Sequence, residues 1–432
     1  MKTKLTGRFW ACLVLFALTG QIAWVVENMY FNVFIYKMFA ATPGDISLMV
    51  MASAISATVT TVLIGALSDK IGKRKIFISM GYILWGISIL SFVLIRKDIL
   101  GALFPSVVSV SALGCSLVIA LDCVMTFFGS SANDAAFNAW LVDSTDSTNR
   151  GAAEGVNAMM PLIALLMVFG GFMAFDLDLE SSWTVIYTVI GLTVTAIGIT
   201  GFFLIKEPKL EKSKESYIKT VIYGFLPSTV KENRSLYFYF AAFIVFNIAI
   251  QIFMPYLIIY YEVTLQMKDY VMIMAPAIIL ASAVTAVWGR VYDKRGFGFS
   301  SSFCLLWLIL GFVILFFFTK TVPVFIGSLL MMCGYLSGMA VFGARIRDLI
   351  PENKAGMLQG VRIFSQVLIP GIVGPFIGKT VLKNAEMIQN SDGTESFVPN
   401  ADIFLAALLV IVLLVIILLL PRIINSKKEK TA

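Results

Sequence analysis

The feature that most constrains this fold is a series of long apolar runs. Twelve runs reach the length of about 20 mostly apolar residues that an α-helix needs to cross a bilayer. They cover residues 8–39, 43–67, 76–95, 107–141, 151–175, 183–205, 236–261, 269–292, 299–319, 322–344, 357–382 and 401–420. A membrane β-barrel would instead show segments of about 10 residues with alternating hydrophobicity. We therefore expect an all-α integral membrane protein with twelve transmembrane helices.

Composition supports this class and excludes others. Hydrophobic residues make up 59% of the chain and charged residues only 14%, against about 25% charged in soluble proteins. The net charge of +7 comes from clusters between the apolar runs, so we expect the lipid bilayer as a partner and no nucleic acid. The chain has no His, and its five Cys lie in apolar runs without metal-ligand spacing. We expect no metal and no cofactor beyond a coupling ion.

Two of the runs exceed the thickness of a bilayer. The run 107–141 contains a Gly-Ser-Ser sequence at 129–131, which suggests a bend, and we interpret it as one bent or tilted helix. The run 8–39 is not followed by a small-residue cleavage site. It is expected to be a retained helix and not a signal peptide.

The distribution of Lys and Arg predicts the orientation. With the N-terminus inside, 25 of the 33 Lys and Arg residues fall on the inner side and 7 on the outer side, with Arg362 inside a helix. Positive residues accumulate on the cytoplasmic side of membrane proteins. We therefore expect a multi-pass protein of the cell membrane (inner or plasma membrane) with both termini in the cytoplasm.

An internal repeat divides the chain into two halves. The pattern G-x-x-x-D-K-x-G occurs as GALSDKIG after the second run and as GRVYDKRG after the eighth. Asp143 precedes Gly151 by eight residues, as Asp348 precedes Gly356. Repeats at equivalent positions indicate two related units. We predict a six-helix bundle over 1–205, a cytoplasmic linker over 206–235 and a second six-helix bundle over 236–432.

The repeated loop is typical of a conformational gate. Gly65 and Gly289 would let a neighbouring helix approach closely. Asp69 and Asp293 can accept hydrogen bonds at the N-terminal end of an adjacent helix. Arg74 belongs to the basic cluster that would hold the loop on the cytoplasmic face. The alternative is that these loops only fix the topology.

This motif resembles the signature of the major facilitator superfamily, and the resemblance extends over the whole chain. It implies two pseudo-symmetric six-helix bundles around a central cavity that opens alternately to each side, in a protein that works as a monomer. It also implies that Asp69 helps to lock the cytoplasmic side. Arg150 then looks like a partner for Asp69.

A narrower resemblance is to the glycoside–pentoside–hexuronide cation symporters, the melibiose-permease-like group. It rests on residues 133–140 (NDAAFNAW) and on Asp143 to Gly151. That group has a functional aspartate in helix four, and Asp134 is the matching position. The acidic cation ligands that the group carries in helix two have no counterpart, because residues 53–61 (SAISATVTT) are neutral.

Ionisable residues inside the apolar runs are candidate site residues, because each costs at least about 2.5–3.5 kcal/mol at the bilayer centre. Asp134 lies about 13 Å of helical rise from Asp143, near mid-membrane, where it can bind a proton, a cation or sugar hydroxyls. Asn138 follows one turn later. The alternative for Asp134 is a structural hydrogen bond between helices. We place Asp122 near the outer surface.

Amides and one aromatic residue in the first run suit a sugar. The spacing predicts one helical stripe, which consists of Gln21, Trp24, Asn28 and Asn32. Glu27 lies in the same helix and either joins the site or is exposed to water in an outer vestibule. In such a stripe the amides bind hydroxyl groups and the ring packs against C–H groups.

Two regions of the second half offer further candidates. Asn247 and Gln251 in helix seven would complete a central polar site or pack against other helices. Arg362, with Gln366 nearby, would pair with Asp134 or Glu27 in one state or extend to the cytoplasmic edge.

The leading hypothesis is symport of a small organic solute, a sugar or glycoside, with H⁺ or Na⁺ by alternating access. The alternatives are an exporter or lipid-like solute carrier, or a receptor without transport. The chain has no enzyme motif.

Overall fold

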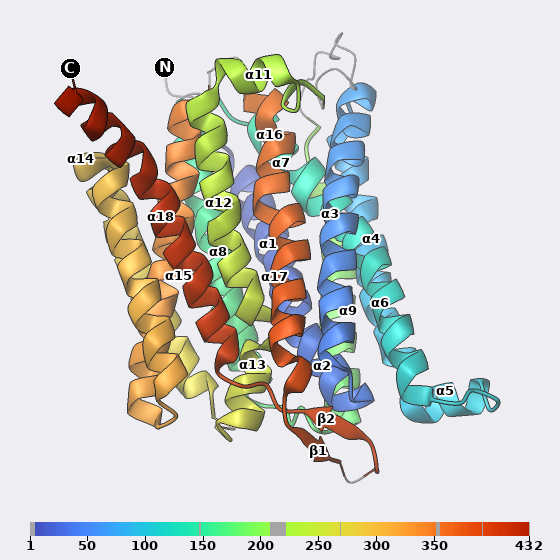
Figure 1. Ribbon diagram of the computed structural model, residues 1–432. Helices are drawn as coiled ribbons and strands as arrows, with labels where there is room; N and C mark the ends of the chain where they lie inside the picture. Colours follow the sequence, from blue (N-terminus) through green and yellow to red (C-terminus); the bar gives the residue numbers. More distant parts are fainter. Residues whose placement is uncertain are drawn as a thin grey trace. The chain divides into compact units, whose positions relative to one another are not determined.

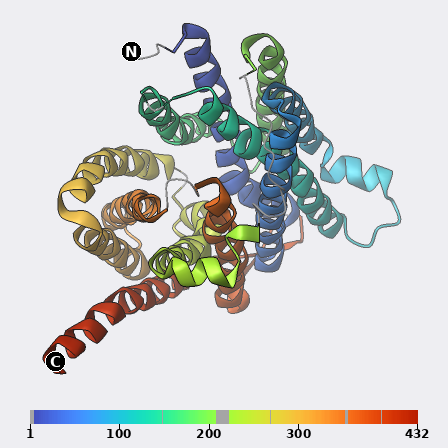
Figure 2. The same cartoon turned by 90° about the horizontal axis from the view of Figure 1, so that it is seen from above.

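The computed structural model describes residues 5–146, 148–207, 222–267, 269–350, 355–390 and 392–431. Nearly all of them are helical (Figure 1), and Figure 2 shows the same helices end-on. Within these residues, eleven helices are long and apolar enough to cross a membrane. The chain divides into two compact units, Met1–Tyr217 with Gln389–Ser396 and Ile218–Ile388 with Phe397–Ala432. The division falls inside the segment 206–235.

The first unit contains the helices up to residue 204. They are α1 (Gly7–Val25), η1 (Val26–Tyr30), α2 (Phe31–Phe39), α3 (Pro43–Ile71), α4 (Arg74–Ser91), η2 (Phe92–Leu94), α5 (Lys97–Leu103), α6 (Val110–Gly129), η3 (Ser130–Phe137), α7 (Asn138–Asp143), α8 (Arg150–Phe172) and α9 (Glu180–Leu204). The segments η1 and η3 are π-helical. The predicted single helix over 107–141 is therefore confirmed as α6–η3–α7, and η3 begins within the Gly-Ser-Ser sequence.

The second unit contains the remaining helices. They are α11 (Pro227–Glu232), α12 (Arg234–Phe253), η4 (Met254–Tyr256), α13 (Leu257–Ile259), η5 (Tyr260–Thr264), α14 (Val271–Phe317), α15 (Thr321–Leu349), α16 (Ala355–Ile363), η7 (Phe364–Leu368), α17 (Ile369–Val381), η8 (Leu382–Asn384) and α18 (Asp402–Thr431). The segments η5 and η7 are also π-helical. A short hairpin of β1 (Met387–Gln389) and β2 (Glu395–Phe397) precedes α18.

The long helix α14 is two helices joined at Gly296. This residue has φ 73° and ψ −179°, which is not helical. The indole nitrogen of Trp288 donates to the carbonyl oxygen of Ser300 at 3.2 Å, although a straight helix would separate these residues by about 18 Å. The chain therefore folds back at Gly296. The eleven candidate spans of the described residues thus contain the twelve predicted helices.

Substitution of Gly296 with Ala is expected to destabilise the protein by about 1–3 kcal/mol, because this region of φ/ψ space is essentially restricted to glycine. Gly289→Ala is the matched control. Gly289 is helical, and a Cβ there would have no neighbour within 4 Å, so Ala is expected to be neutral or stabilising. Thermal unfolding in detergent measures both. Equal melting temperatures for the two variants would contradict this account.

Close helix contacts in the first unit position the segment η3. A Cβ on Gly20 of α1 would lie 2.3 Å from Nδ2 of Asn133. A Cβ on Gly81 of α4 would lie 2.5 Å from Cβ of Ala132. Side chains larger than hydrogen at these two glycines would push η3 away. Because Gly20 and Gly81 have no side chain, η3 can pack closely against α1 and α4.

The sequence analysis does not predict the helix α5 or the β1–β2 hairpin. Lys97, at the start of α5, donates to Oδ2 of Asp392 in the turn of the hairpin at 2.6 Å. The hydrogen bond from Lys97, with two more from Thr394, holds the pKa of Asp392 below its usual value. The contact therefore persists through neutral and moderately acidic pH. Both elements are too short and too polar to produce an apolar run.

Candidate functional site

Three acidic side chains lie inside the long helices of the first unit. Glu27 is in the π-turn η1, Asp134 is in the π-turn η3, and Asp122 is in α6. A π-turn has i→i+5 hydrogen bonds and is frequent at functional sites. Glu27 and Asp134, the two acids that the sequence predicts to bind the solute or the cation, thus lie where the helix departs from α geometry.

Glu27 is held by hydroxyl groups from two other helices. Its Oε1 accepts hydrogen bonds from Ser53 of α3 and Thr126 of α6, each at 2.8 Å. The residue is only 6% exposed, and Oε2 has no hydrogen-bond partner in the described part of the chain. The expectation that Glu27 might be exposed in an outer vestibule is wrong, because α3 and α6 pack around it.

Asp122 is buried more deeply than the sequence suggests. It is 2% exposed, and its Oδ1 has no hydrogen-bond partner among the described residues. It is close enough to Glu27 for the two carboxylates to repel each other when both are charged, and Ser53 interacts with both. The predicted place of Asp122 near the outer surface of the membrane stays a prediction, because burial between helices does not measure depth in the bilayer. Asp122 and Glu27 form a buried acidic pair.

Asp134 lies next to the pair on the following segment. The hydroxyl of Ser130 donates to its Oδ2 at 3.1 Å, and the side chain is half-buried. Asn138 is exposed, and its amide donates to the main-chain carbonyl of Asp134 at 3.1 Å. No Lys or Arg of the described residues forms an ion pair with Asp134, Glu27 or Asp122.

The predicted stripe on helix one is not uniform. Trp24 donates from its indole nitrogen to Oδ1 of Asn133 at 3.3 Å, and Gln21 is half-buried. Asn28 is exposed, whereas Asn32 is 1% exposed. The amides of Asn28 and Asn32 donate to the main-chain carbonyls of Trp24 and Asn28, one turn earlier in each case. The role of this stripe in binding a solute stays a prediction.

The candidates of the second half lie in the second unit. Asn247 is buried, and its amide donates to the carbonyl of Phe243 in its own helix at 2.8 Å. Gln251 packs closely against Gly374 of α17. A Cβ built on Gly374 would lie only 2.4 Å from the Cβ of Gln251. Arg362 and Gln366 are half-buried, at the end of α16 and in η7. A pairing of Arg362 with the acids of the first unit stays a prediction.

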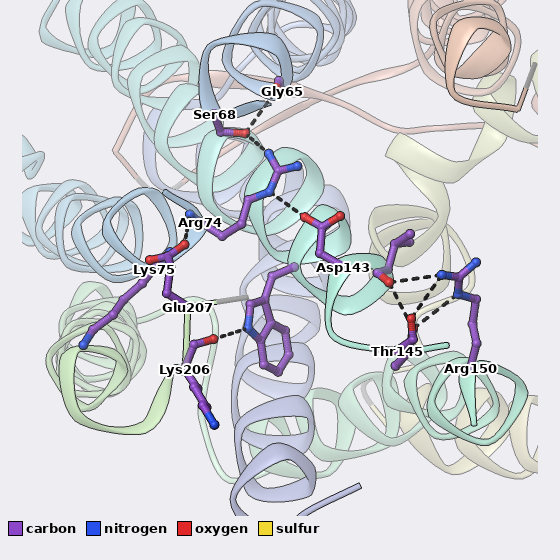
Figure 3. Close-up of polar contacts among 11 residues, drawn as sticks. Gly65, Ser68, Arg74, Lys75, Asp143, Thr145, Arg150, Lys206 and Glu207 are labelled. Atoms are coloured by element: carbon purple, nitrogen blue, oxygen red, sulfur yellow. Dashed lines mark hydrogen bonds and ion pairs between the residues drawn. The ribbon is translucent and has the colours of Figure 1, made fainter. Parts of the chain in front are cut away.

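The loop after helix two forms a buried ionic network (Figure 3). Arg74 is 4% exposed, and its Nε donates to Oδ2 of Asp143 at 2.9 Å. A second guanidinium nitrogen donates to the hydroxyl of Ser68. This network joins the ends of α3, α4 and α7.

Glu207 caps the start of α4. Its carboxylate accepts hydrogen bonds from the main-chain N–H groups of Arg74 and Lys75 (Figure 3). A negative charge at this end of a helix is favourable, because the first N–H groups lack partners within the helix. The indole of Trp140 also donates to the carbonyl of Lys206 at 3.2 Å. Residues 206–207 are thus tied to α4 and α7.

Two expectations for this loop need correction. A Cβ on Gly65 would meet Cβ of Ala135 at an ordinary 3.9 Å, and one on Gly289 would meet nothing within 4 Å. Close helix approach therefore does not explain either glycine in this structure. Glycine is instead required at the last position of each motif, since Gly72 has φ 70° and Gly296 has φ 73°. Both residues reverse the chain between two helices.

The remaining gate residues have other partners. Arg150 donates to the carbonyls of Val142 at 3.1 Å and Thr145 at 3.3 Å. The side chain of Asp69, its expected partner, lies outside the described part of the structure. Asp293 is exposed, and its neighbour Tyr292 donates a hydrogen bond to Asp348. In the repeated motif Tyr292 has the position of Ser68, so the Tyr292–Asp348 hydrogen bond is not the counterpart of the Arg74–Asp143 ion pair.

Comparison with known proteins identifies the family. A family model described as Major Facilitator Superfamily matches residues 9–375. The chain belongs to the Major Facilitator Superfamily. Membership makes it a multi-pass membrane transporter of a small-molecule substrate and not an enzyme. No curated protein matches the chain in sequence.

Solved structures of superfamily members share the fold. A mutant of the nucleoside transporter NupG has a TM-score of 0.73 and 10% identity, over 94% of this chain and 97% of that one. A bacterial homologue of the human lysosomal transporter Spinster has a TM-score of 0.66 and 13% identity, over 94% of each chain. The xylose transporter XylE of E. coli has a TM-score of 0.66 and 14% identity, over 95% and 98%. These identities show the fold alone.

Sequence reasoning missed some polar residues of this superfamily member. Helix seven continues through η5 to Thr264, so Glu262 is also inside a span, beyond the predicted end at 261. The hydroxyl partners Ser53 and Thr126 have no sequence pattern that distinguishes them from other Ser and Thr residues in apolar runs.

A cavity of about 590 Å³ lies in the second unit and is lined by Arg234, Tyr239, Phe297 and neighbours. It contains none of the predicted site residues.

Proposed function

We propose that the protein is a secondary active transporter that moves a small organic solute, a sugar or glycoside, by symport with a cation. The observation that carries the proposal is the group of Glu27, Asp122 and Asp134 within the helices of one unit. Glu27 and Asp122 are buried, and none of the three has an ion-pair partner among the described residues. A charged carboxylate is costly in such a place. A cation that binds and leaves during the cycle removes this cost.

The surroundings of Asp134 favour a neutral polar solute. Trp24 and Asn133 are hydrogen-bonded to each other next to Asp134, and the Trp24 and Trp85 rings lie 5.0 Å apart. An aromatic face and a nearby carboxylate are groups that bind sugars through their C–H faces and hydroxyls. The resemblance of residues 133–140 to the melibiose-permease-like group supports the same class of solute.

The same proposal includes the arrangement in the membrane. Both termini would lie in the cytoplasm of a cell in whose membrane the protein works as a monomer. The network around Arg74 would then lie on the cytoplasmic side, where it would form in one conformation and open in another. Its buried pair from α4 and α7 supports a role in holding that side closed.

Transport in sealed liposomes tests this function. Thermal stabilisation of the purified protein, across a panel of sugars, glycosides and nucleosides, first selects the solute, because a ligand of the folded state raises its stability. Uptake of the radiolabelled hit is then measured with an inward pH gradient, an inward Na⁺ gradient or neither. We expect accumulation above the outside concentration with one of the two gradients. Mere equilibration under all three conditions would contradict symport.

A further inference from the structure

Three oxygen atoms from three helices form a closed triangle in the first unit. They are Oε1 of Glu27 in η1, Oγ of Ser53 in α3 and Oγ1 of Thr126 in α6. Each of the three pairs is 2.8 Å apart. This is the usual length of an O–H···O hydrogen bond. All three sides of the triangle therefore have hydrogen-bond geometry.

Counting hydrogens decides the state of Glu27. A hydroxyl group donates one hydrogen bond, and an ionised carboxylate donates none. Ser53 and Thr126 together supply two hydrogens for three contacts. With Glu27 ionised, one side would be two oxygens at 2.8 Å without a hydrogen between them. A third hydrogen on Oε1 completes a ring in which each oxygen donates one bond and accepts one.

We propose that Glu27 is the proton-binding group of this transporter, and that its proton closes the ring with Ser53 and Thr126. The proposal rests on the cation-coupled transport proposed above and names the cation as H⁺. The ring oxygens are already in contact with one another, which favours a proton over a metal ion between them.

The titratable groups around Glu27 favour its neutral form. Asp122 and Cys123 face it from α6, and Asp134 faces it from η3. Tyr187 of α9 interacts with Asp122, and Tyr82 of α4 with Asp134. None of these groups is cationic, and the helix α3 contributes only neutral hydroxyls such as Ser53. A charged Glu27 would therefore add to the negative charge of its neighbours.

Loss of the proton has a structural consequence. The proton passes from Oε1 of Glu27 to water on the releasing side of the membrane. A carboxylate remains, and one of the three hydrogen bonds is lost. The ring is a link between η1, α3 and α6, so its opening weakens the contact of three helices at once. Proton release is thereby connected to the packing of the first unit.

Infrared difference spectroscopy tests the proposal on the full-length protein in lipid, without any solute. The pH is raised stepwise, and the C=O stretch of protonated carboxyl groups is followed in H₂O and D₂O. We expect a band in the wild type that disappears at high pH and is lost in Glu27→Gln. The Asp134→Asn variant is expected to keep it.

The hydroxyl partners provide a second test, which holds even if Glu27→Gln fails to fold. Thr126→Val and Ser53→Ala each remove a ring hydrogen bond at the carboxyl group, so each is expected to move the band to a different wavenumber. Ser130→Ala removes a hydroxyl from η3 outside the ring and is expected to leave the band in place.

Three results would overturn the proposal. The first is the absence of a band that depends on Glu27. The second is a band that neither Thr126→Val nor Ser53→Ala changes, and the third is loss of the band when choline chloride is replaced by NaCl. The last would identify a Na⁺ site. Uptake that ignores both ion gradients would contradict the proposed symport but would leave this spectrum unchanged, so the two failures are distinguishable.

Discussion

Asp134→Asn is expected to reduce gradient-driven accumulation of the solute to the level of empty liposomes, while the protein still folds and inserts. The amide has nearly the same shape as the carboxyl group, and its oxygen can still accept the hydrogen bond from Ser130. It carries no negative charge at any pH. Coupled uptake and thermal unfolding of the purified variant, measured side by side, separate the loss of function from a loss of structure.

The matched control for this variant is Ser130→Ala. It removes the hydrogen-bond donor of Asp134 and keeps the carboxylate, so accumulation is expected to persist with at most a change in its pH dependence. Wild-type accumulation by Asp134→Asn would show that the carboxylate is not needed. Failure of Asp134→Asn to fold would indicate that Asp134 has a structural role between helices.

Asp143→Leu is expected to lower the free energy of unfolding by about 3–5 kcal/mol, because it leaves a buried charge without its partner. That charge is the guanidinium of Arg74, whose side chain is only 5% exposed, against 20% for Asp143. Ser68 remains as a hydrogen-bond acceptor but carries no negative charge. Equilibrium denaturation in detergent measures the change.

A double-mutant cycle identifies the cause of this loss. Arg74→Met combined with Asp143→Leu removes both charges, and we expect it to recover most of the stability that Asp143→Leu loses. Lys75→Ala is the control, because Lys75 contacts Glu207 through its main-chain N–H, which the substitution keeps. If Asp143→Leu were no less stable than Lys75→Ala, the ion pair would contribute little to the first unit.

The helices were predictable because apolar length is a strong signal. Each predicted run falls on a helix of the structure, including the two that meet at Gly296. The signal ends where the chain leaves the membrane. The helix α5 and the β1–β2 hairpin are short and partly polar, and the ion pair Lys97–Asp392 joins residues 295 positions apart. No local pattern reports such a contact.

The candidate site was predictable in part for the same reason. Carboxylates inside apolar runs are conspicuous, so Glu27, Asp122 and Asp134 stand out. Their hydroxyl partners do not, because a hydroxyl in a helix usually bonds its own main chain, as Thr58 does with the carbonyl of Ala54 at 2.8 Å. Helical projections with a fixed angle per residue also lose accuracy beyond a π-turn, which holds one more residue than an α-turn, as η1 does before Asn32.

The π-turns have a consequence for the history of this chain. An α-helix that gains one residue either rotates everything beyond the insertion by about 100° or absorbs the extra residue locally as a π-turn. The segments η1, η3, η5 and η7 have the geometry that such an extra residue would produce. An ancestral helix one residue shorter at η1 would keep the packing of α1 and α2, yet a carboxylate at the place of Glu27 would face another direction. Gain of a single codon is therefore enough to bring an acid into contact with α3 and α6 without rebuilding the bundle.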